Sequence, residues 1–144
     1  MEMILKELKN ELSYQIRLDA INKIKDYDLN DDNYRTLREV VIELALHDRV
    51  FAVKNAAFLL CQKNKLKKNG EVINLGKKNT GYSPSDIRKM FLKIKRETEM
   101  KELNLELFKD HFQKIAPKMY DVMVYEHMYF DNWIRGIYKY LSNN

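Results

Sequence analysis

The sequence predicts an all-α protein. Apolar residues recur at spacings of three and four along most of the chain, which is the period of an amphipathic helix. The 144 residues include only four glycines and two prolines, too few for the many turns of a β-fold. This length suits a single domain covering residues 1–144. We expect about five to seven helices, the first four stacked as two antiparallel hairpins.

The first helical unit is expected between Glu2 and Lys25, where leucine and isoleucine recur at helical spacing. The following segment, 26–33, is rich in Asp and Asn, whose side chains favour turns and caps, and it ends this unit. Two helices follow at Tyr34–Leu46 and Arg49–Gln62. Asp48 lies in the turn between them, where it is suited to cap the second helix, and the short turn predicts an antiparallel pair.

Part of the chain aligns with itself at an offset of 37 residues, which places Ile16 on Val53 and Arg17 on Lys54. The run from His47 to Ala57 resembles the second-helix pattern of HEAT-type repeats. In that family an Asp opens the turn, a Val and a basic residue follow, and small alanines allow close helix approach. The resemblance covers about residues 1–62. It implies hairpins stacked in a HEAT-like manner, and an irregular helical bundle is the alternative.

Residues 63–83 interrupt the helical pattern. They hold three of the four glycines and many lysines, and they include a short extended run at Glu71–Leu75. A helix from Pro84 to about Met100 should follow, because Ser83 is a suitable N-cap and Asp86 can return the cap. The sequence therefore predicts a basic loop leading directly into a well-capped helix.

The remaining residues predict two or three further helices. The first is expected at Leu103–Ile115, with Leu107, Phe108 and Phe112 on its inner face. Pro117 ends it. The last stretch, Lys118–Leu141, is rich in methionine and aromatic residues, and Asp131 or Asn132 is expected to cap a final helix within it.

Charge is distributed unevenly along the chain. Residues 62–96 contain eleven Lys and Arg but only two acidic residues, a net charge of +9, whereas the whole chain, with 26 basic and 21 acidic residues, carries +5. The rest of the chain therefore sums to −4. A basic segment in an otherwise mildly acidic protein is typical of a polyanion-binding surface.

The helix that begins at Pro84 separates its charges from its apolar residues. At about 100° per residue, Ile87, Met90, Phe91 and Ile94 share one arc, and the cations lie on the other side with Leu92 among them. Together with the loop, this face predicts contact with nucleic-acid phosphates. The candidate residues are Lys67, Lys68, Lys77, Lys78, Arg88, Lys89, Lys93, Lys95 and Arg96.

The predicted function is that of a non-enzymatic binding module. Lysine outnumbers arginine nine to two in residues 62–96, and an ammonium lacks the fork that reads a guanine edge, so binding should be largely independent of base sequence. The alternatives are a solvated face without a partner and an acidic protein as the partner. A further alternative is a protein-interaction or regulatory module that uses the helical groove or the aromatic C-terminal helices.

The aromatic C-terminal stretch has two interpretations of its own. Tyr125, Tyr129 and Trp133 recur at spacings of four, with basic residues interleaved. Such a surface suits stacked bases or a partner helix. Alternatively, these residues close the core together with Met119 and Met123.

No pattern in the sequence predicts catalysis, a cofactor or a metal. His47, His111 and His127 lie in separate segments, and the order of residues in Gly76–Gly81 does not match a phosphate-binding loop. Cys61 is the only cysteine, which favours a reducing compartment, and we expect a cytoplasmic protein. Charged residues at the start of the chain and the lack of a long apolar run predict neither a signal peptide nor a membrane span.

Overall fold

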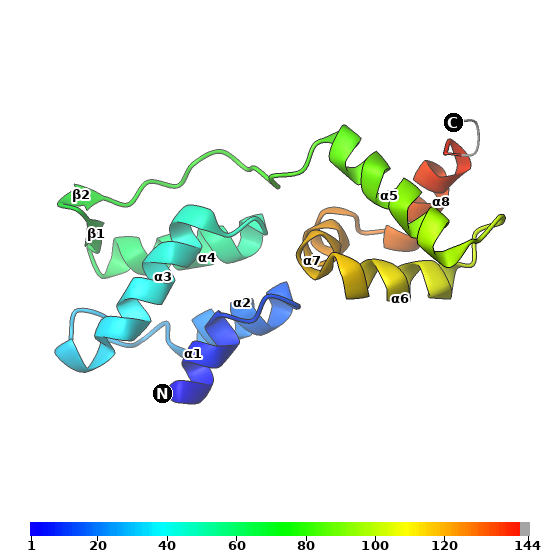
Figure 1. Ribbon diagram of the computed structural model, residues 1–144. Helices are drawn as coiled ribbons and strands as arrows, with labels where there is room; N and C mark the ends of the chain where they lie inside the picture. The colour runs from blue at the N-terminus through cyan, green and yellow to red at the C-terminus, as the bar shows by residue number, and fades with distance from the viewer. Residues whose placement is uncertain (142–144) are drawn as a thin grey trace. The chain divides into compact units, whose positions relative to one another are not determined.

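The computed structural model describes residues 1–141 and confirms the all-α class (Figure 1). Within these residues there are eight α-helices, more than the five to seven expected, with one short 3-10 helix and one two-stranded hairpin. The elements are α1 (Glu2–Leu8), α2 (Tyr14–Lys23), η1 (Asp32–Tyr34), α3 (Arg35–His47), α4 (Phe51–Lys63), β1 (Lys67–Lys68), β2 (Glu71–Val72), α5 (Pro84–Thr98), α6 (Leu105–Ile115), α7 (Pro117–Glu126) and α8 (Phe130–Lys139).

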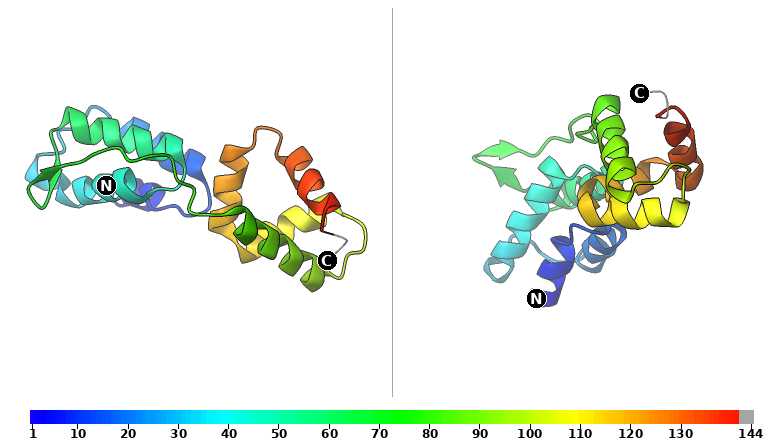
Figure 2. Two further views of the ribbon diagram at one scale, coloured as in Figure 1. Left: turned by 90° about the horizontal axis from the view of Figure 1, so that it is seen from above. Right: turned by 45° about the vertical axis from the view of Figure 1, so that its right-hand side comes forward.

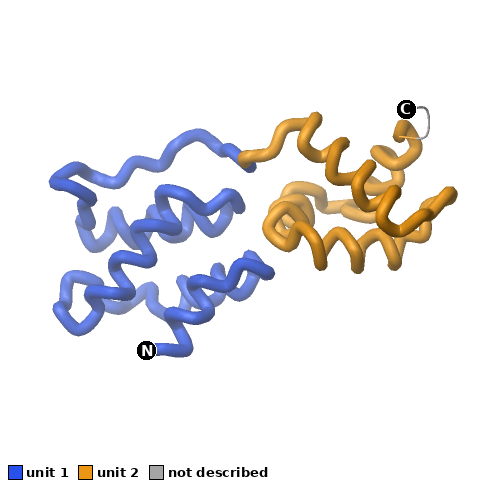
Figure 3. Tube along the Cα trace, in the orientation of Figure 1, with its two compact units in different colours: residues 1–80 blue, residues 81–144 orange. Residues whose placement is uncertain are grey.

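The chain divides into two compact units, coloured separately in Figure 3. Unit 1 spans Met1–Thr80, and unit 2 spans Gly81–Asn144. The single domain expected from chain length stays a prediction. No helix of residues 1–141 is long and apolar enough to cross a membrane.

Unit 1 is built from two helical hairpins. Helix α1 packs against α2 and α3, while α4 packs against α3 and α2. Leu8, Leu37, Val41 and Val53 are fully buried between these helices. Their burial removes apolar surface from water and provides the main favourable contribution to folding of this unit.

The helical segment predicted at Glu2–Lys25 is divided into α1 and α2 by a polar turn. The side-chain oxygen of Asn10 accepts hydrogen bonds from the backbone N–H groups of Leu12 and Ser13, both at 2.9 Å. Ser13 then caps α2 by accepting from the backbone N–H of Ile16. Such side-chain bonds compete with helical backbone bonds and end α1 near residue 9.

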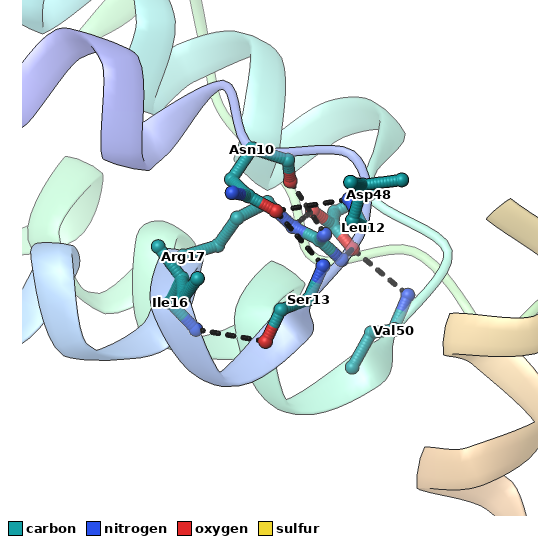
Figure 4. Close-up of polar contacts among 7 residues, drawn as sticks. All are labelled: Asn10, Leu12, Ser13, Ile16, Arg17, Asp48 and Val50. Carbon is teal, nitrogen blue, oxygen red and sulfur yellow. Dashed lines mark hydrogen bonds and ion pairs between the residues drawn. The ribbon is translucent and has the colours of Figure 1, made fainter. Parts of the chain in front are cut away.

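A buried ion pair joins the two hairpins (Figure 4). The Arg17 guanidinium on α2 donates two hydrogen bonds to the Asp48 carboxylate, at 2.9 and 3.2 Å, and a third to the carbonyl of Asn10 at 2.8 Å. Both side chains are less than a tenth exposed. One Asp48 oxygen also accepts from the backbone N–H of Val50. The N-cap position of α4 is Val50, so Asp48 organises the turn before the helix rather than capping it as predicted.

Lys54 repeats part of this arrangement in the second hairpin. The offset of 37 residues pairs it with Arg17, and both residues lie in the second helix of their hairpin. The Lys54 ammonium donates to the carbonyl of Leu46 at 3.2 Å, and Arg17 donates to the carbonyl of Asn10, in each case near the end of the preceding helix. The two aligned positions therefore make similar contacts, although the acceptors do not align, because Asn10 falls on His47 at this offset.

The basic loop is partly anchored to unit 1. A turn at Asn69–Gly70, both with positive φ, joins β1 to β2, and only Glu71–Val72 of the predicted extended run forms a strand. Leu66 and Ile73 are buried on either side of this hairpin. Figures 1 and 2 show the segment after β2 running back along α3 and α4, and a Cβ built at Gly76 would lie 3.9 Å from the Lys54 ammonium.

Unit 2 is organised around aromatic side chains. The predicted capping box at the start of α5 is present: Ser83 accepts from the backbone N–H of Asp86, and Asp86 accepts from that of Ser83. Phe91, Phe108 and Phe112 are fully buried and contact one another edge to face or tilted. Leu107 is exposed, which corrects its predicted place on the inner face of α6.

The last two helices begin at positions that differ in part from those predicted. Pro117 is the first residue of α7, where its missing N–H costs nothing. Helix α8 begins at Phe130 with Tyr129 as N-cap residue, so Asp131 and Asn132 lie inside the first turn and do not cap it. Asp131 instead accepts from the Lys109 ammonium on α6 at 3.0 Å, and that contact raises the pKa of Lys109.

The buried ion pair predicts a large effect on stability. Asp48→Ala leaves the Arg17 guanidinium buried without its carboxylate and should lower the free energy of unfolding by about 3–5 kcal/mol, measured by urea titration. Glu39→Ala is the control, because its ion pair with Arg35 is exposed and should contribute at most about 1 kcal/mol. Equal losses in the two variants would contradict a structural role specific to the buried pair.

Candidate nucleic-acid interface

The orientation of helix α5 is set by its apolar face, which is buried in the core of unit 2. Phe91 and Ile94 are fully buried. The Phe91 ring centroid lies 4.7 Å from that of Phe108, 5.8 Å from Phe112 and 5.4 Å from Trp133. These contacts come from α6 and α8 and fix the rotation of α5 about its own axis, so the opposite face of the helix is directed away from the core.

Three of the five cations predicted for α5 lie on the side away from the aromatic core. Lys89, Lys93 and Arg96 are exposed, whereas Arg88 and Lys95, three and four positions from Phe91, are half-buried. The Lys95 ammonium lies 5.4 Å from the centre of the Tyr138 ring, a cation–π contact that holds this side chain against α8. We call these five positions the basic face of α5, with Lys89, Lys93 and Arg96 at its centre.

The carboxylates on α5 already have partners. Hydrogen bonds from the backbone and side chain of Ser83 lower the pKa of Asp86. Glu97 is hydrogen-bonded at 2.9 Å to the His111 ring on α6, which together with Lys93 and Arg96 lowers the pKa of Glu97. Both groups stay ionised at neutral pH and reduce the positive potential at the two ends of the helix.

The remaining candidates, Lys67, Lys68, Lys77 and Lys78, lie in unit 1 and are all exposed. The Lys68 ammonium donates to the Glu43 carboxylate of α3 at 2.8 Å. This hydrogen bond lowers the pKa of Glu43, and His47 lies 3.5 Å from the same carboxylate. Sequence reasoning missed this ion pair because Glu43 and Lys68 are 25 residues apart. The Lys68 charge is therefore partly neutralised within unit 1.

The C-terminal aromatics combine core and surface positions. Met119 and Met123 are buried, and the Trp133 ring stacks on the His127 ring at 4.2 Å with an interplanar angle of 11°. Tyr129, in contrast, is 72 % exposed, so it does not close the core. The core interpretation therefore holds for the methionines and for Trp133, while the turn between α7 and α8 remains at the surface.

No cluster of three or more metal-ligating side chains occurs within residues 1–141. Cys61 is buried, and burial raises the pKa of its thiol to about 11, so the reactive thiolate is scarce at neutral pH. Comparisons with protein-family models, curated proteins and solved structures find no match for this chain.

The contact between Lys68 and Glu43 predicts a measurable titration. The folded-state pKa of Glu43 lies below 4.5, so the ion pair is present above the unfolded-state pKa and is lost as pH falls through the folded value. Lys68→Met should raise the Glu43 pKa toward 4.5, as measured by carbon NMR of its carboxyl group. Lys67→Met, the neighbouring control, should leave it unchanged, and a shift of equal size in both variants would contradict a specific pair.

Proposed function

We propose that this protein is a non-enzymatic helical binding module that contacts nucleic-acid phosphates, largely independently of base sequence, through the basic loop and the basic face of α5. The observation that carries the proposal is the exposure of Lys89, Lys93 and Arg96 on the side of α5 opposite the buried Phe91, with Arg88 and Lys95 flanking them. Phosphate contacts of this kind contribute affinity without reading bases.

Helix stability alone does not account for the positions of these cations. Lys95 and Arg96 lie in the last turn of α5, where the negative end of the helix dipole stabilises cations. Arg88 and Lys89 lie near the amino end, where the same dipole opposes a positive charge and favours an anion. A phosphate partner explains the cations nearer the amino end, because there the backbone and the side chains attract the same ligand.

Unit 1 supplies the proposed scaffold of the loop. The similar bonds of Arg17 and Lys54 to a carbonyl near the end of the preceding helix support a HEAT-like relation between its two hairpins. A cytoplasmic location is part of the proposal, since the single cysteine is buried and has no partner in the sequence for a disulfide.

The alternative function is a protein-interaction or regulatory module. Met128, Tyr129 and Tyr140 are 87, 72 and 68 % exposed, and large exposed side chains of this kind favour contact with another protein. An acidic protein is also a candidate partner of the basic face. Salt separates an apolar surface from a charged one, because phosphate binding weakens steeply as salt rises and apolar binding does not.

Charge reversal on α5 is the main test. Lys89→Glu, Lys93→Glu and Arg96→Glu together should abolish micromolar binding to short DNA and RNA, as measured by fluorescence anisotropy at two salt concentrations. Each lost phosphate contact makes the log–log salt slope shallower by about 0.9 on duplex DNA. These side chains are exposed, so the melting temperature should change little.

A matched variant controls for net charge. Lys6→Glu, Lys9→Glu and Lys25→Glu make the same change in charge at exposed positions of unit 1 outside the candidate residues. This control should retain most of the affinity. Unchanged binding after reversal on α5, or equal loss in both variants, would reject the basic face as the binding surface.

Glu43 provides a test in the opposite direction. Glu43→Gln removes the carboxylate that holds the Lys68 ammonium and makes this cation available to a phosphate. Affinity for duplex DNA at low salt should rise, and the salt slope should steepen by about one unit. Glu39→Gln removes an exposed acid from the same helix that is paired with Arg35 instead, and serves as the control. A larger gain from Glu39→Gln would show that the effect is one of net charge alone.

A further inference from the structure

A pocket lies beside the carboxyl end of α5, within unit 2. Its volume is about 470 Å³, and it is lined by Leu92, Lys95, Arg96, Glu99, Met100 and Leu141. This volume falls in the usual range for small-molecule sites. The lining combines three apolar side chains, two cations and one carboxylate, so it suits a ligand that has a flat apolar body, an anionic group and a hydrogen-bond donor.

The apolar part of the pocket interrupts the basic face of α5. Leu92 is the apolar residue among the cations of that face, and it is half-buried. Leu141, which follows α8, and Met100, which follows α5, complete the apolar lining. Leu141 is already buried, so the surface open to a ligand is that of Leu92 and Met100. A phosphate alone gains nothing from these two side chains, whereas a nucleobase buries apolar surface against them.

The wall of the pocket is held in place by Tyr138. Its ring lies 5.4 Å from the Lys95 ammonium, and its hydroxyl donates toward the carbonyl oxygens of Met100 and Lys101, at 3.5 and 3.3 Å. These contacts link α8 to the end of α5 and to the turn after it. Lys95 is thus positioned before a ligand arrives, which reduces the entropic cost of binding.

Glu99 occupies a backbone conformation that favours glycine. It is the C-cap residue of α5, with φ of 53° and ψ of 25°, in the left-handed region where a Cβ is disfavoured. Glycine is the usual residue at such a helix end. Retaining a glutamate there is explained if its carboxylate contributes to the pocket, and a carboxylate accepts hydrogen bonds from the exocyclic amine of a base such as cytosine.

We propose that this pocket holds one unpaired amine-bearing base of a single-stranded nucleic acid. The phosphate next to that base contacts Lys95 and Arg96, the base lies against Leu92 and Met100 above the buried Leu141, and its exocyclic amine donates to Glu99. A base in a duplex enters the pocket only by leaving its stack, which costs free energy. The basic face therefore prefers single strands, and cytosine over thymine. This inference rests on the proposed function.

The test uses the full chain and three fluorescent probes of equal length: oligo-dC, oligo-dT and a mixed-sequence duplex. Binding is measured by anisotropy at low salt. The expected result is tighter binding of oligo-dC than of oligo-dT by about five-fold, with the duplex weaker than oligo-dC by at least the same factor. Cytosine carries the exocyclic amine that thymine lacks, so the ratio of the two affinities reports the contact with Glu99.

Three variants separate the pocket from the rest of the surface. Glu99→Leu, which removes the acceptor oxygens, should bring the ratio of dC to dT affinity close to one. Glu99→Gly should do the same while raising the melting temperature, because glycine relieves the left-handed backbone. Leu92→Ala should reduce the preference for oligo-dC over the duplex, whereas Leu107→Ala, an exposed leucine on α6 outside the pocket lining, should not.

The three probes distinguish a failure of the pocket proposal from a failure of phosphate binding itself. Salt-dependent binding with equal affinity for oligo-dC, oligo-dT and duplex would overturn the pocket proposal and leave phosphate binding in place. A dC preference that survives Glu99→Leu and Leu92→Ala would also overturn it. Absence of binding to every probe at low salt would reject the proposed function, and the pocket proposal with it.

Discussion

The burial of Phe91 is the constraint on which the candidate interface depends. Its ring contacts Phe108, Phe112 and Trp133, so α5 has one favourable rotation about its axis. In a helix, residues three or four positions apart share a face, so Arg88 and Lys95 flank Phe91, whereas Lys89, Lys93 and Arg96 lie out of phase with it. Packing energy in the core thus determines where the charges are displayed. The buried residues and the cations are both encoded in one 15-residue helix.

Unit 1 fixes its arrangement with a polar contact instead. The planar guanidinium of Arg17 matches the two oxygens of Asp48, and this geometry sets the position of α2 against the turn between α3 and α4. Lys68 of β1 binds Glu43 on α3, which attaches the β1–β2 hairpin to this helix. Ile73, the residue directly after β2, is buried as well. The placement of the basic loop therefore follows from the packing of the second hairpin.

Local patterns in the sequence were sufficient for some of these features and not for others. The capping box at Ser83 and the two faces of α5 depend on residues within a few positions of one another. The cap is confirmed, and of the five cations expected at the surface, three are exposed while Arg88 and Lys95 are half-buried. Two helices were expected in residues 2–25, but the position of their turn at Asn10 was not predicted, because helical spacing continues across it. Asp131 was assigned to a cap, but its partner is Lys109, 22 residues away. The pairing of Lys68 with Glu43 likewise depends on tertiary structure, which no periodicity reveals.

The two groups of cations differ in their acidic neighbours. In unit 1, the Glu43 carboxylate holds the Lys68 ammonium at 2.8 Å. On α5, Asp86 is engaged by the cap and Glu97 by His111. Because those carboxylates are engaged at the two ends of the helix, the middle of the basic face has no acid of α5 within it. Under the proposed function, the larger share of the phosphate affinity is therefore expected from α5 and the smaller share from the loop.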